Sequence, residues 1–157
     1  MKTLHIDGQT GASRIMVGGR LADLGAYAPE GAPLFLITDA RVRSLYGDRF
    51  PRATVIEIGP GEAHKTLDTM AKIYEALITA EADRDAFIAA VGGGIVCDVA
   101  GFAASTYLRG VRFGFAPTTL LAQVDAGVGG KNGVNFQKYK NMVGTFNQPE
   151  VVICDLE

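Results

Sequence analysis

The run Gly92-Gly93-Gly94 is the first feature of the sequence with a definite chemical use, and glycines are concentrated from here to Gly144. An apolar segment precedes the run and a helical pattern follows it, which predicts a turn from a strand into a helix. Glycine leaves backbone N–H groups uncovered, and a helix N-terminus favours anions, so this junction suits a diphosphate. It is not the full dinucleotide fingerprint, because Cys97 stands where a third glycine belongs and no acid follows about 20 residues later. A tight turn without a ligand is the alternative.

Asp98 follows this run, within the first turn or so of the expected helix. A carboxylate there can stabilise the helix dipole, or it can accept a hydrogen bond from a cofactor hydroxyl or amide. The residues themselves leave both interpretations open.

A second glycine-rich segment, Gly129-Gly130-Lys131-Asn132, is similar to a phosphate-binding loop. It departs from that pattern twice, since Asp125 occupies the position of the first glycine and Asn132 replaces Ser or Thr. A nucleoside triphosphatase is therefore disfavoured, and a flexible backbone that places Lys131 is expected instead. Lys131 and the pair Lys140-Asn141 are candidate anion partners, although a solvated loop lysine is the ordinary alternative.

Glu62 and Lys65 precede the clearest helical pattern of the chain. Glu62 near a helix start is ordinary capping chemistry, whereas Lys65 there opposes the helix dipole and so points to an anionic ligand. His5 and His64 are the only histidines and form no zinc-binding motif, so no metal site is expected within this chain. A nucleophile elbow of the G-x-S-x-G type is also missing.

Alternating segments determine the expected fold. Apolar runs predict strands at 3–7, 14–17, 33–38, 53–58, 86–91, 111–116 and 151–154, and helical patterns cover 65–82, 95–107 and 117–124. Within 65–82, one face is expected to carry Leu67, Met70, Tyr74, Leu77 and Ile78. The alternation predicts a single α/β domain over 1–157, with a Rossmann-like layered architecture and a mostly parallel sheet flanked by helices.

Composition excludes several classes of protein. The chain has 157 residues with 48% hydrophobic and 20% charged residues, which is a globular composition. A formal net charge of −2 gives no basis for binding nucleic acid or a membrane surface. The N-terminus has no apolar signal core and no apolar run could cross a bilayer, so a cytoplasmic location is expected. Cys97 and Cys154 are expected to be buried and reduced.

Six blocks of this sequence together resemble the 3-dehydroquinate synthases over nearly the whole chain. They are Pro60-Gly61-Glu62-x-x-Lys65, Gly92-Gly93-Gly94-x-x-x-Asp98, the run from Gly101 to Gly110, the run from Pro117 to Asp125, Gly129-Gly130-Lys131-Asn132 and Lys140-Asn141-Met142. Each block alone would be a weak signal, but all six occur in the order and spacing of the family.

The resemblance implies a lyase of the shikimate pathway that depends on NAD and on a divalent metal. Its substrate would be a sugar phosphate, 3-deoxy-D-arabino-heptulosonate 7-phosphate, converted to 3-dehydroquinate with release of phosphate. In the family, NAD+ transiently oxidises a ring hydroxyl, phosphate is eliminated, and the hydride returns before ring opening and aldol closure. The protein's task is then to bind and orient the cofactor.

The resemblance also assigns roles to residues. The nucleotide and ribose portions of NAD are assigned to Asp39, Glu62 and Lys65, the diphosphate and ribose to Gly93, Gly94 and Asp98, and further cofactor contacts to Thr118, Thr119 and Lys140. The substrate's hydroxyl and acidic groups are assigned to Asp125, Lys131 and Asn141. Arg109 would reach the substrate phosphate of a neighbouring subunit, which implies a homodimer; a guanidinium suits that geometry.

The chain departs from the family in two respects. Gly127 stands where the family usually has Ser, which loosens that loop. The family's metal ligands, one Glu and two His that bind zinc or cobalt, belong to a C-terminal helical domain that this chain does not contain. The chain is therefore expected to be the NAD-binding N-terminal domain of a longer two-domain enzyme, and to be inactive alone.

Two alternatives stand beside this interpretation. One is a non-catalytic nucleotide-binding or dimerisation module. The other is a different sugar-phosphate cyclase, such as a 2-deoxy-scyllo-inosose or epi-valiolone synthase; the Lys131 and Lys140 blocks favour the dehydroquinate synthases. The metal-dependent glycerol dehydrogenases share the layout but are expected to lack those two blocks.

Overall fold

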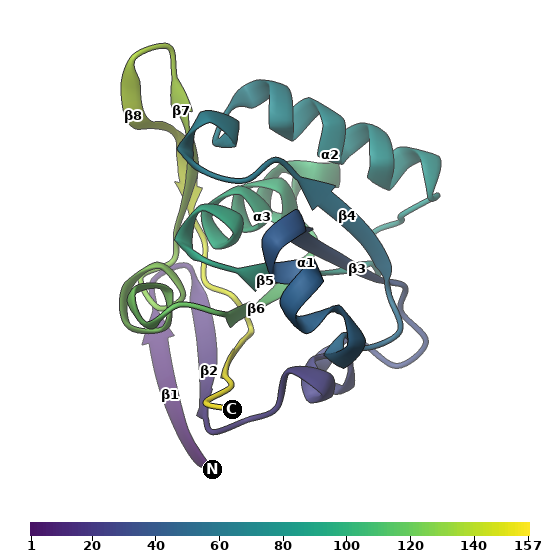
Figure 1. Cartoon of the computed structure of the whole chain (residues 1–157), viewed down its shortest axis with the longest axis vertical. Coiled ribbons are helices and arrows are strands. Elements are labelled where there is room, and N and C mark those ends of the chain that lie inside the picture. The colour runs from purple at the N-terminus through teal and green to yellow at the C-terminus, as the bar shows by residue number, and fades with distance from the viewer.

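The protein is built on a seven-stranded sheet with helices on both faces (Figure 1). The computed structural model describes all residues from Met1 to Glu157. The strands of this sheet are β1 (Lys2–Gly8), β2 (Gly11–Val17), β3 (Leu34–Asp39), β4 (Thr54–Ile58), β5 (Phe87–Gly92), β6 (Arg112–Pro117) and β9 (Val151–Cys154). Their order is β1-β2-β9-β6-β5-β3-β4, and every pair is parallel except β1 with β2. The predicted Rossmann-like fold with a mostly parallel sheet is confirmed.

The central strand β5 shows why the sheet must be covered on both sides. All six of its residues are buried. Ile88 and Ala90 face the larger core, whereas Phe87, Ala89 and Val91 face the smaller one. An apolar run without alternation is the pattern of a strand that is buried on both faces, as the sequence predicts.

Different helices cover the two faces. The helices α2 (Leu67–Thr79) and α3 (Gly94–Thr106) contribute to the larger core, and α1 (Ala40–Tyr46) packs on the opposite face with the short 3-10 helix Leu21–Tyr27. Short 3-10 turns also occur at Gly47–Arg49, Glu62–His64 and Tyr107–Arg109. Cys97 and Cys154 are free and buried, as expected. No helix is long and apolar enough to cross a membrane.

Helix α2 is shorter than the predicted 65–82. Its first turn is capped by Thr66, whose Oγ1 accepts a hydrogen bond from the N–H of Thr69, and it ends before Glu81, which adopts a left-handed φ of 54°. The predicted buried face is wrong in part: Ile78 is 65% exposed and Leu67 is 40% exposed, whereas Ile73 is buried. Successive helical residues are rotated by about 100°, so Ile78 cannot share the direction of Leu77.

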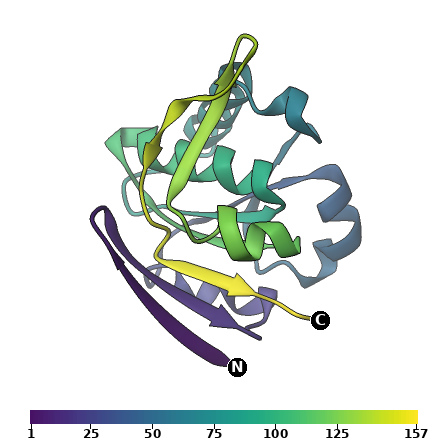
Figure 2. The same ribbon diagram turned by 90° about the vertical axis from the view of Figure 1, so that its left-hand side faces the viewer.

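The segment from Lys131 to Phe146 forms strands, so Lys131 does not lie on the flexible backbone that the sequence predicts around it. It forms a hairpin of β7 (Lys131–Phe136) and β8 (Tyr139–Phe146), a separate two-stranded sheet that projects past α3 (Figures 1 and 2). The predicted helix 117–124 is also different, because Pro117 ends β6 and the helical turns close as a π-helix over Ala122–Ala126. Both differences lie in the part of the chain that carries the predicted substrate ligands.

Close packing fixes the base of the hairpin on α3. A Cβ placed on Gly101 of α3 would lie 2.0 Å from Oδ1 of Asn132 in β7. Asn132 is buried, and its Nδ2 donates to the carbonyl oxygens of Gly130 (3.1 Å) and Asn147 (2.8 Å). The missing side chain of Gly101 is what allows the hairpin to approach the helix.

We therefore expect Gly101→Ala to destabilise the protein, although alanine favours helices, because the new methyl group overpacks this contact by about 1–3 kcal/mol. Urea unfolding monitored by circular dichroism measures this loss. The matched control is Gly47→Ala, where a Cβ would meet no atom closer than the Arg43 side chain at 3.7 Å. Equal unfolding midpoints for the two variants would contradict the proposed packing.

Candidate cofactor and substrate site

The chain reverses its direction of travel across the sheet at β3. From β3 the chain proceeds to β4 on one side, and from β5 it proceeds to β6 on the other. The connections that leave the carboxyl ends of β3 and β5 therefore run in opposite directions across the sheet. The buried hydroxyl of Thr38 donates to the carbonyl oxygen of Val91 (2.8 Å) and joins the two strands just before this point. Asp39 ends β3, and Gly93 follows the end of β5. In open α/β sheets such a crevice is where ligands bind.

Packing within the fold requires glycine at only one of the three positions of this turn. A Cβ on Gly92 would lie 2.6 Å from the Val96 side chain, so Gly92 is required by packing. A Cβ on Gly93 or Gly94 would meet only Thr119 at 3.5 Å or Ala126 at 3.4 Å, both ordinary contacts, and Gly93 has a φ of −74° that any residue can adopt. The fold therefore explains Gly92 but not Gly93 or Gly94, and both of these lie at the N-terminus of the 13-residue helix α3. Their open backbone is suited to an anion.

Thr118 and Thr119 line the same turn. The N–H of Thr118 donates to the carbonyl oxygen of Gly92 (2.9 Å), and Thr119 lies beside Gly93. The Thr119 hydroxyl also accepts from the N–H of Ala122 (3.2 Å) and so begins the next helical segment. The structure thus brings both predicted threonines to the glycine turn.

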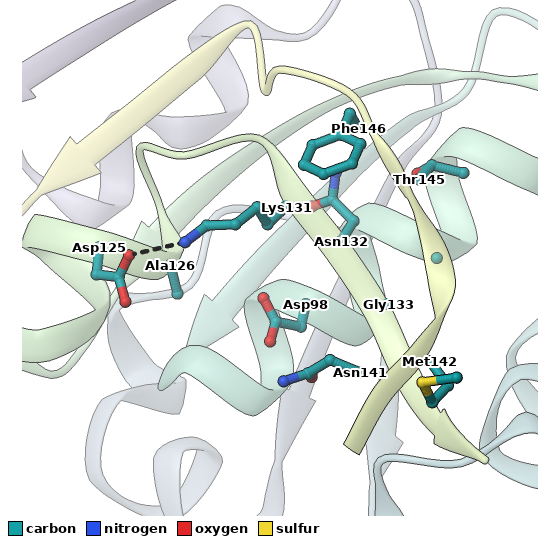
Figure 3. A pocket seen from close by; sticks show the side chains of 11 residues that line it. Asp98, Asp125, Ala126, Lys131, Asn132, Gly133, Asn141, Met142, Thr145 and Phe146 are labelled. Carbon is teal, nitrogen blue, oxygen red and sulfur yellow. Dashed lines mark hydrogen bonds and ion pairs between the residues drawn. The ribbon is translucent and has the colours of Figure 1, made fainter. Parts of the chain in front are cut away.

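Next to the turn lies a cavity of about 420 Å³ (Figure 3). It contains four of the predicted site residues, Asp98, Asp125, Lys131 and Asn141, which come from α3, the π-helix, β7 and β8. The remaining lining residues are Ala126, Asn132, Gly133, Met142, Gly144, Thr145 and Phe146. The hairpin therefore supplies most of the cavity wall.

Lys65 is the charged residue that joins these elements. Only 5% exposed, it places Nζ 2.5 Å from Oδ2 of Asp98 and 2.6 Å from Oδ1 of Asn141. It lies before the helix cap Thr66, and the anion that compensates its charge is Asp98 of the same chain. Asp98 itself lies beyond the first turn of α3, so an interaction with the helix dipole does not explain it. The ion pair with Lys65 does.

The pKa values of the carboxyl groups of Asp98 and Glu62 are shifted in opposite directions. Burial raises the pKa of Asp98, because a charged carboxylate is poorly solvated there, and Lys65 opposes this shift. The hydrogen bond from Asn135 lowers the pKa of Glu62, with smaller contributions from Lys140 and Lys65.

Asp125 and Lys131 form an ion pair at the mouth of the cavity. Their Nζ and Oδ1 atoms are 3.3 Å apart, and both side chains are 61% exposed. Asp125 belongs to the π-helix, a rare conformation that is frequent at functional sites. A pair this exposed is held weakly by its partner, so both groups can turn toward a ligand.

Lys140, Asp39 and Arg109 are among the predicted residues that lie outside the cavity lining. Lys140 is on β8 with Nζ 3.9 Å from Oε1 of Glu62, and Asp39 caps α1 by accepting from the N–H of Val42 (2.9 Å). Arg109 is exposed near the C-terminal end of α3, opposite the end that carries the glycine turn. It does not meet this chain's cavity, and its expected role in a neighbouring subunit stays a prediction.

Sequence reasoning missed several residues of the site, namely Asn132, Asn135, Met142, Thr145 and Phe146. All belong to the hairpin. The available signal was the short polar pair Gln137-Lys138 between two segments that contain valine and aromatic residues, which is typical of a hairpin. The structure brings no three His, Cys, Asp or Glu side chains together as a metal site.

A mostly parallel sheet with helices on both faces, and an open glycine turn where its strand order reverses, define a Rossmann-like domain. Residues 55–157 match the 3-dehydroquinate synthase N-terminal family. The chain belongs to that family.

Known proteins agree with this assignment. The 3-dehydroquinate synthase of Pelotomaculum thermopropionicum is 43% identical over 169 residues, covering 100% of this chain and 46% of the relative. A 2-deoxy-scyllo-inosose synthase complexed with carbaglucose-6-phosphate, NAD+ and Co2+ superposes with a TM-score of 0.85 at 30% identity, over 98% of this chain and 45% of its own. The 2-epi-5-epi-valiolone synthase of Streptomyces hygroscopicus, with NAD+ and Zn2+ bound, gives 0.78 at 28% identity, over 99% and 45%. The chain thus spans about half the length of these relatives.

The ion pair of Lys65 and Asp98 generates a prediction about pH. Lys65→Met leaves the Asp98 carboxylate partly buried without a cation, which raises its folded-state pKa further above the unfolded value of about 3.9. A raised folded pKa means that stability is complete below the unfolded pKa and is lost as pH rises through the folded pKa. We expect a loss on the order of 3 kcal/mol at pH 7 and a much smaller loss near pH 4.

Urea unfolding of the variant and the wild type at both pH values measures this difference. The double variant Lys65→Met with Asp98→Asn is the control, because it removes the carboxylate and should recover most of the stability at pH 7. A deficit that is equal at the two pH values would show that the ion pair is not its cause.

Proposed function

We propose that this chain is the NAD-binding half of a 3-dehydroquinate synthase, an enzyme that converts 3-deoxy-D-arabino-heptulosonate 7-phosphate to 3-dehydroquinate and phosphate. The observation that carries the proposal is the glycine turn: Gly93 and Gly94 are not required by packing, yet they leave open backbone at the strand reversal, beside a polar cavity. Membership of the family supplies the reaction, and the 43% identity to a 3-dehydroquinate synthase supports it.

The residues of the crevice fit NAD. The backbone N–H groups at Gly93 and Gly94 would hold its diphosphate, with Thr118 and Thr119 donating further hydrogen bonds. Asp39, at the end of β3, and Glu62, Lys65 and Lys140 would hold its ribose and nucleotide portions, and Asp98 would accept from a ribose hydroxyl. When bound, NAD+ supplies hydride transfer, and the chain's own residues bind and orient it.

The cavity residues fit a polyhydroxylated acidic substrate. Asn141 uses its amide oxygen to accept from Lys65, so its NH₂ group is the part that can donate to a substrate oxygen. The ammonium group of Lys131 would neutralise an acidic group, and the exposed carboxylate of Asp125 would accept from a hydroxyl. The phosphate contact of Arg109 would be made in a neighbouring subunit of a homodimer.

The site described here is proposed to be one wall of the complete active site. Next to this wall are three exposed apolar side chains: Leu120 (75% exposed), Leu121 (72%) and Val124 (65%). Such a surface is typical of one that packs against another domain or subunit. We propose that the metal, zinc or cobalt, is held by the half of the relatives that this chain does not span. On this proposal the chain alone binds NAD in the cytoplasm but does not release phosphate from the substrate.

Another sugar-phosphate cyclase is the second candidate, because the two solved structures compared above are cyclases of that kind. Their identities of 30% and 28% are lower than the 43% to the 3-dehydroquinate synthase. An assay of an enzyme containing this chain and a metal-binding half, with each sugar phosphate in turn, distinguishes the two. Turnover of glucose 6-phosphate but not of the heptulosonate phosphate would reject the synthase proposal.

The role of the glycine turn is tested by Gly93→Ala. The fold accommodates the new methyl group, but a diphosphate that approaches the backbone closely would not, so the affinity for NAD+ should fall at least about tenfold. Isothermal titration calorimetry of the chain measures the affinity, and circular dichroism checks the fold. Gly47→Ala, outside both the glycine turn and the cavity lining, should bind as the wild type does; an unchanged affinity in Gly93→Ala would remove the turn from the site.

The role of Lys131 is tested by Lys131→Ala in an enzyme that contains both halves. Loss of an ammonium group that contacts only the substrate should reduce turnover by about 100-fold or more while the affinity for NAD+ is kept. Phosphate release measures the first and calorimetry the second. The matched control is Lys138→Ala, which removes an exposed lysine from the tip of the same hairpin. Loss of NAD+ binding in Lys131→Ala would mean that this lysine is a cofactor ligand.

A further inference from the structure

Asn135, on β7, makes hydrogen bonds to three residues assigned to ligands above. Its backbone N–H donates to the carbonyl oxygen of Lys65 (2.8 Å), and its Nδ2 donates to Oε1 of Glu62 (2.8 Å). Its Oδ1 accepts from the backbone N–H of Asn141 (2.9 Å). No other side chain of the hairpin joins the segment before α2 to β8 through both of its polar atoms.

The contact with Asn141 occurs where the β7–β8 ladder is irregular. Val134 pairs with Val143 and Phe136 pairs with Tyr139, so β8 has extra residues opposite Asn135. Asn141, within this bulge, has a left-handed φ of 53°, which is unfavourable for a residue with a side chain. The amide oxygen of Asn135 takes the place of the missing backbone acceptor and so stabilises this conformation.

These bonds close a ring. The backbone of Asn135 contacts Lys65, the Nζ of Lys65 contacts the side chain of Asn141, and the backbone of Asn141 contacts the side chain of Asn135. A two-stranded hairpin is marginally stable by itself; packing at Asn132 fixes its base and the buried Val134 anchors β7, whereas Asn141 on β8 is exposed. The ring therefore fixes the half of the hairpin that carries Asn141.

We infer that Asn135 is a positioning residue that sets Asn141 toward the substrate and Glu62 toward the cofactor, so that both proposed ligands are placed by one side chain. It acts through these neighbours and touches neither ligand. The inference rests on the proposed function for the identity of the ligands, whereas the geometry it describes can be measured without them.

Two variants separate the two contacts of the side chain. Asn135→Leu, of similar size, removes both, whereas Asn135→Asp keeps an acceptor for Asn141 but places a carboxylate against Glu62. In Asn135→Leu, amide hydrogen exchange at Asn141, followed by NMR, should accelerate at least tenfold, and NAD+ affinity should fall about tenfold. In Asn135→Asp, that exchange should stay near the wild-type rate while the pKa of Glu62 rises.

The control is Gln137→Gly, which removes an exposed amide side chain from the same hairpin at a φ of 55° that glycine adopts readily; it should change none of these quantities. In the complete enzyme, Asn135→Leu should raise KM for the sugar phosphate more than Gln137→Gly does. Unchanged exchange at Asn141 in a folded Asn135→Leu variant would overturn the inference. If that variant does not fold, an unshifted Glu62 pKa in Asn135→Asp overturns it and a raised one supports it. A wild-type chain without affinity for NAD+ overturns the proposed function, while the exchange rates still decide the role of Asn135.

Discussion

The burial of Lys65 is the constraint on which the arrangement of the site depends. It is the one charged residue of the chain that is buried, and an ammonium group removed from water requires an anion and further hydrogen bonds. Asp98 of α3 provides the anion and Asn141 of β8 provides the amide oxygen. Three segments that are distant in sequence are thereby held around one nitrogen atom, and the cavity wall follows from their positions. The same pairing favours the charged form of Asp98, whereas burial alone would favour its neutral form.

The glycine turn and the cavity wall are formed by two different kinds of structure. The parallel sheet supplies a rigid edge, and its strand reversal between β3 and β5 places the glycine turn at the crevice. The separate β7–β8 sheet supplies most of the side chains that line the cavity, and it is attached through the buried Val134, asparagine amides and close glycine contacts rather than through a ladder with the main sheet. The position of the glycine turn is therefore a product of backbone topology, whereas the cavity depends on how the side chains of the hairpin pack and form hydrogen bonds.

This division explains how far the sequence could be interpreted. The buried strands, the helix around Met70 and the turn at Gly93 follow from local patterns, because apolar runs and helical spacing report burial directly. The sequence indicates an anionic ligand for Lys65, whereas the anion that lies beside it is Asp98 of the same chain, which only the tertiary fold brings there. The hairpin was missed for the same reason: its strands are rich in polar residues and glycine and are fixed by contacts such as Asn132 with Gly101. The exposed position of Ile78 shows that a periodic pattern predicts the presence of a helix more reliably than it predicts which residues bound the buried face.

A consequence concerns substrate choice within the superfamily. The chain superposes over 98% of its length on a 2-deoxy-scyllo-inosose synthase with a TM-score of 0.85 although only 30% of the residues are identical, so the shared fold does not distinguish one cyclase from another. Within this domain, a difference in substrate choice would be made by side chains at the cavity, and here these come mainly from the hairpin. The exposed residues of the hairpin can change without disturbing the parallel ladder, because no strand of the main sheet pairs with the hairpin and only Val134 of its side chains is a member of the larger core. The hairpin, more than the glycine turn, is therefore the part of this domain in which specificity for a sugar phosphate would be encoded.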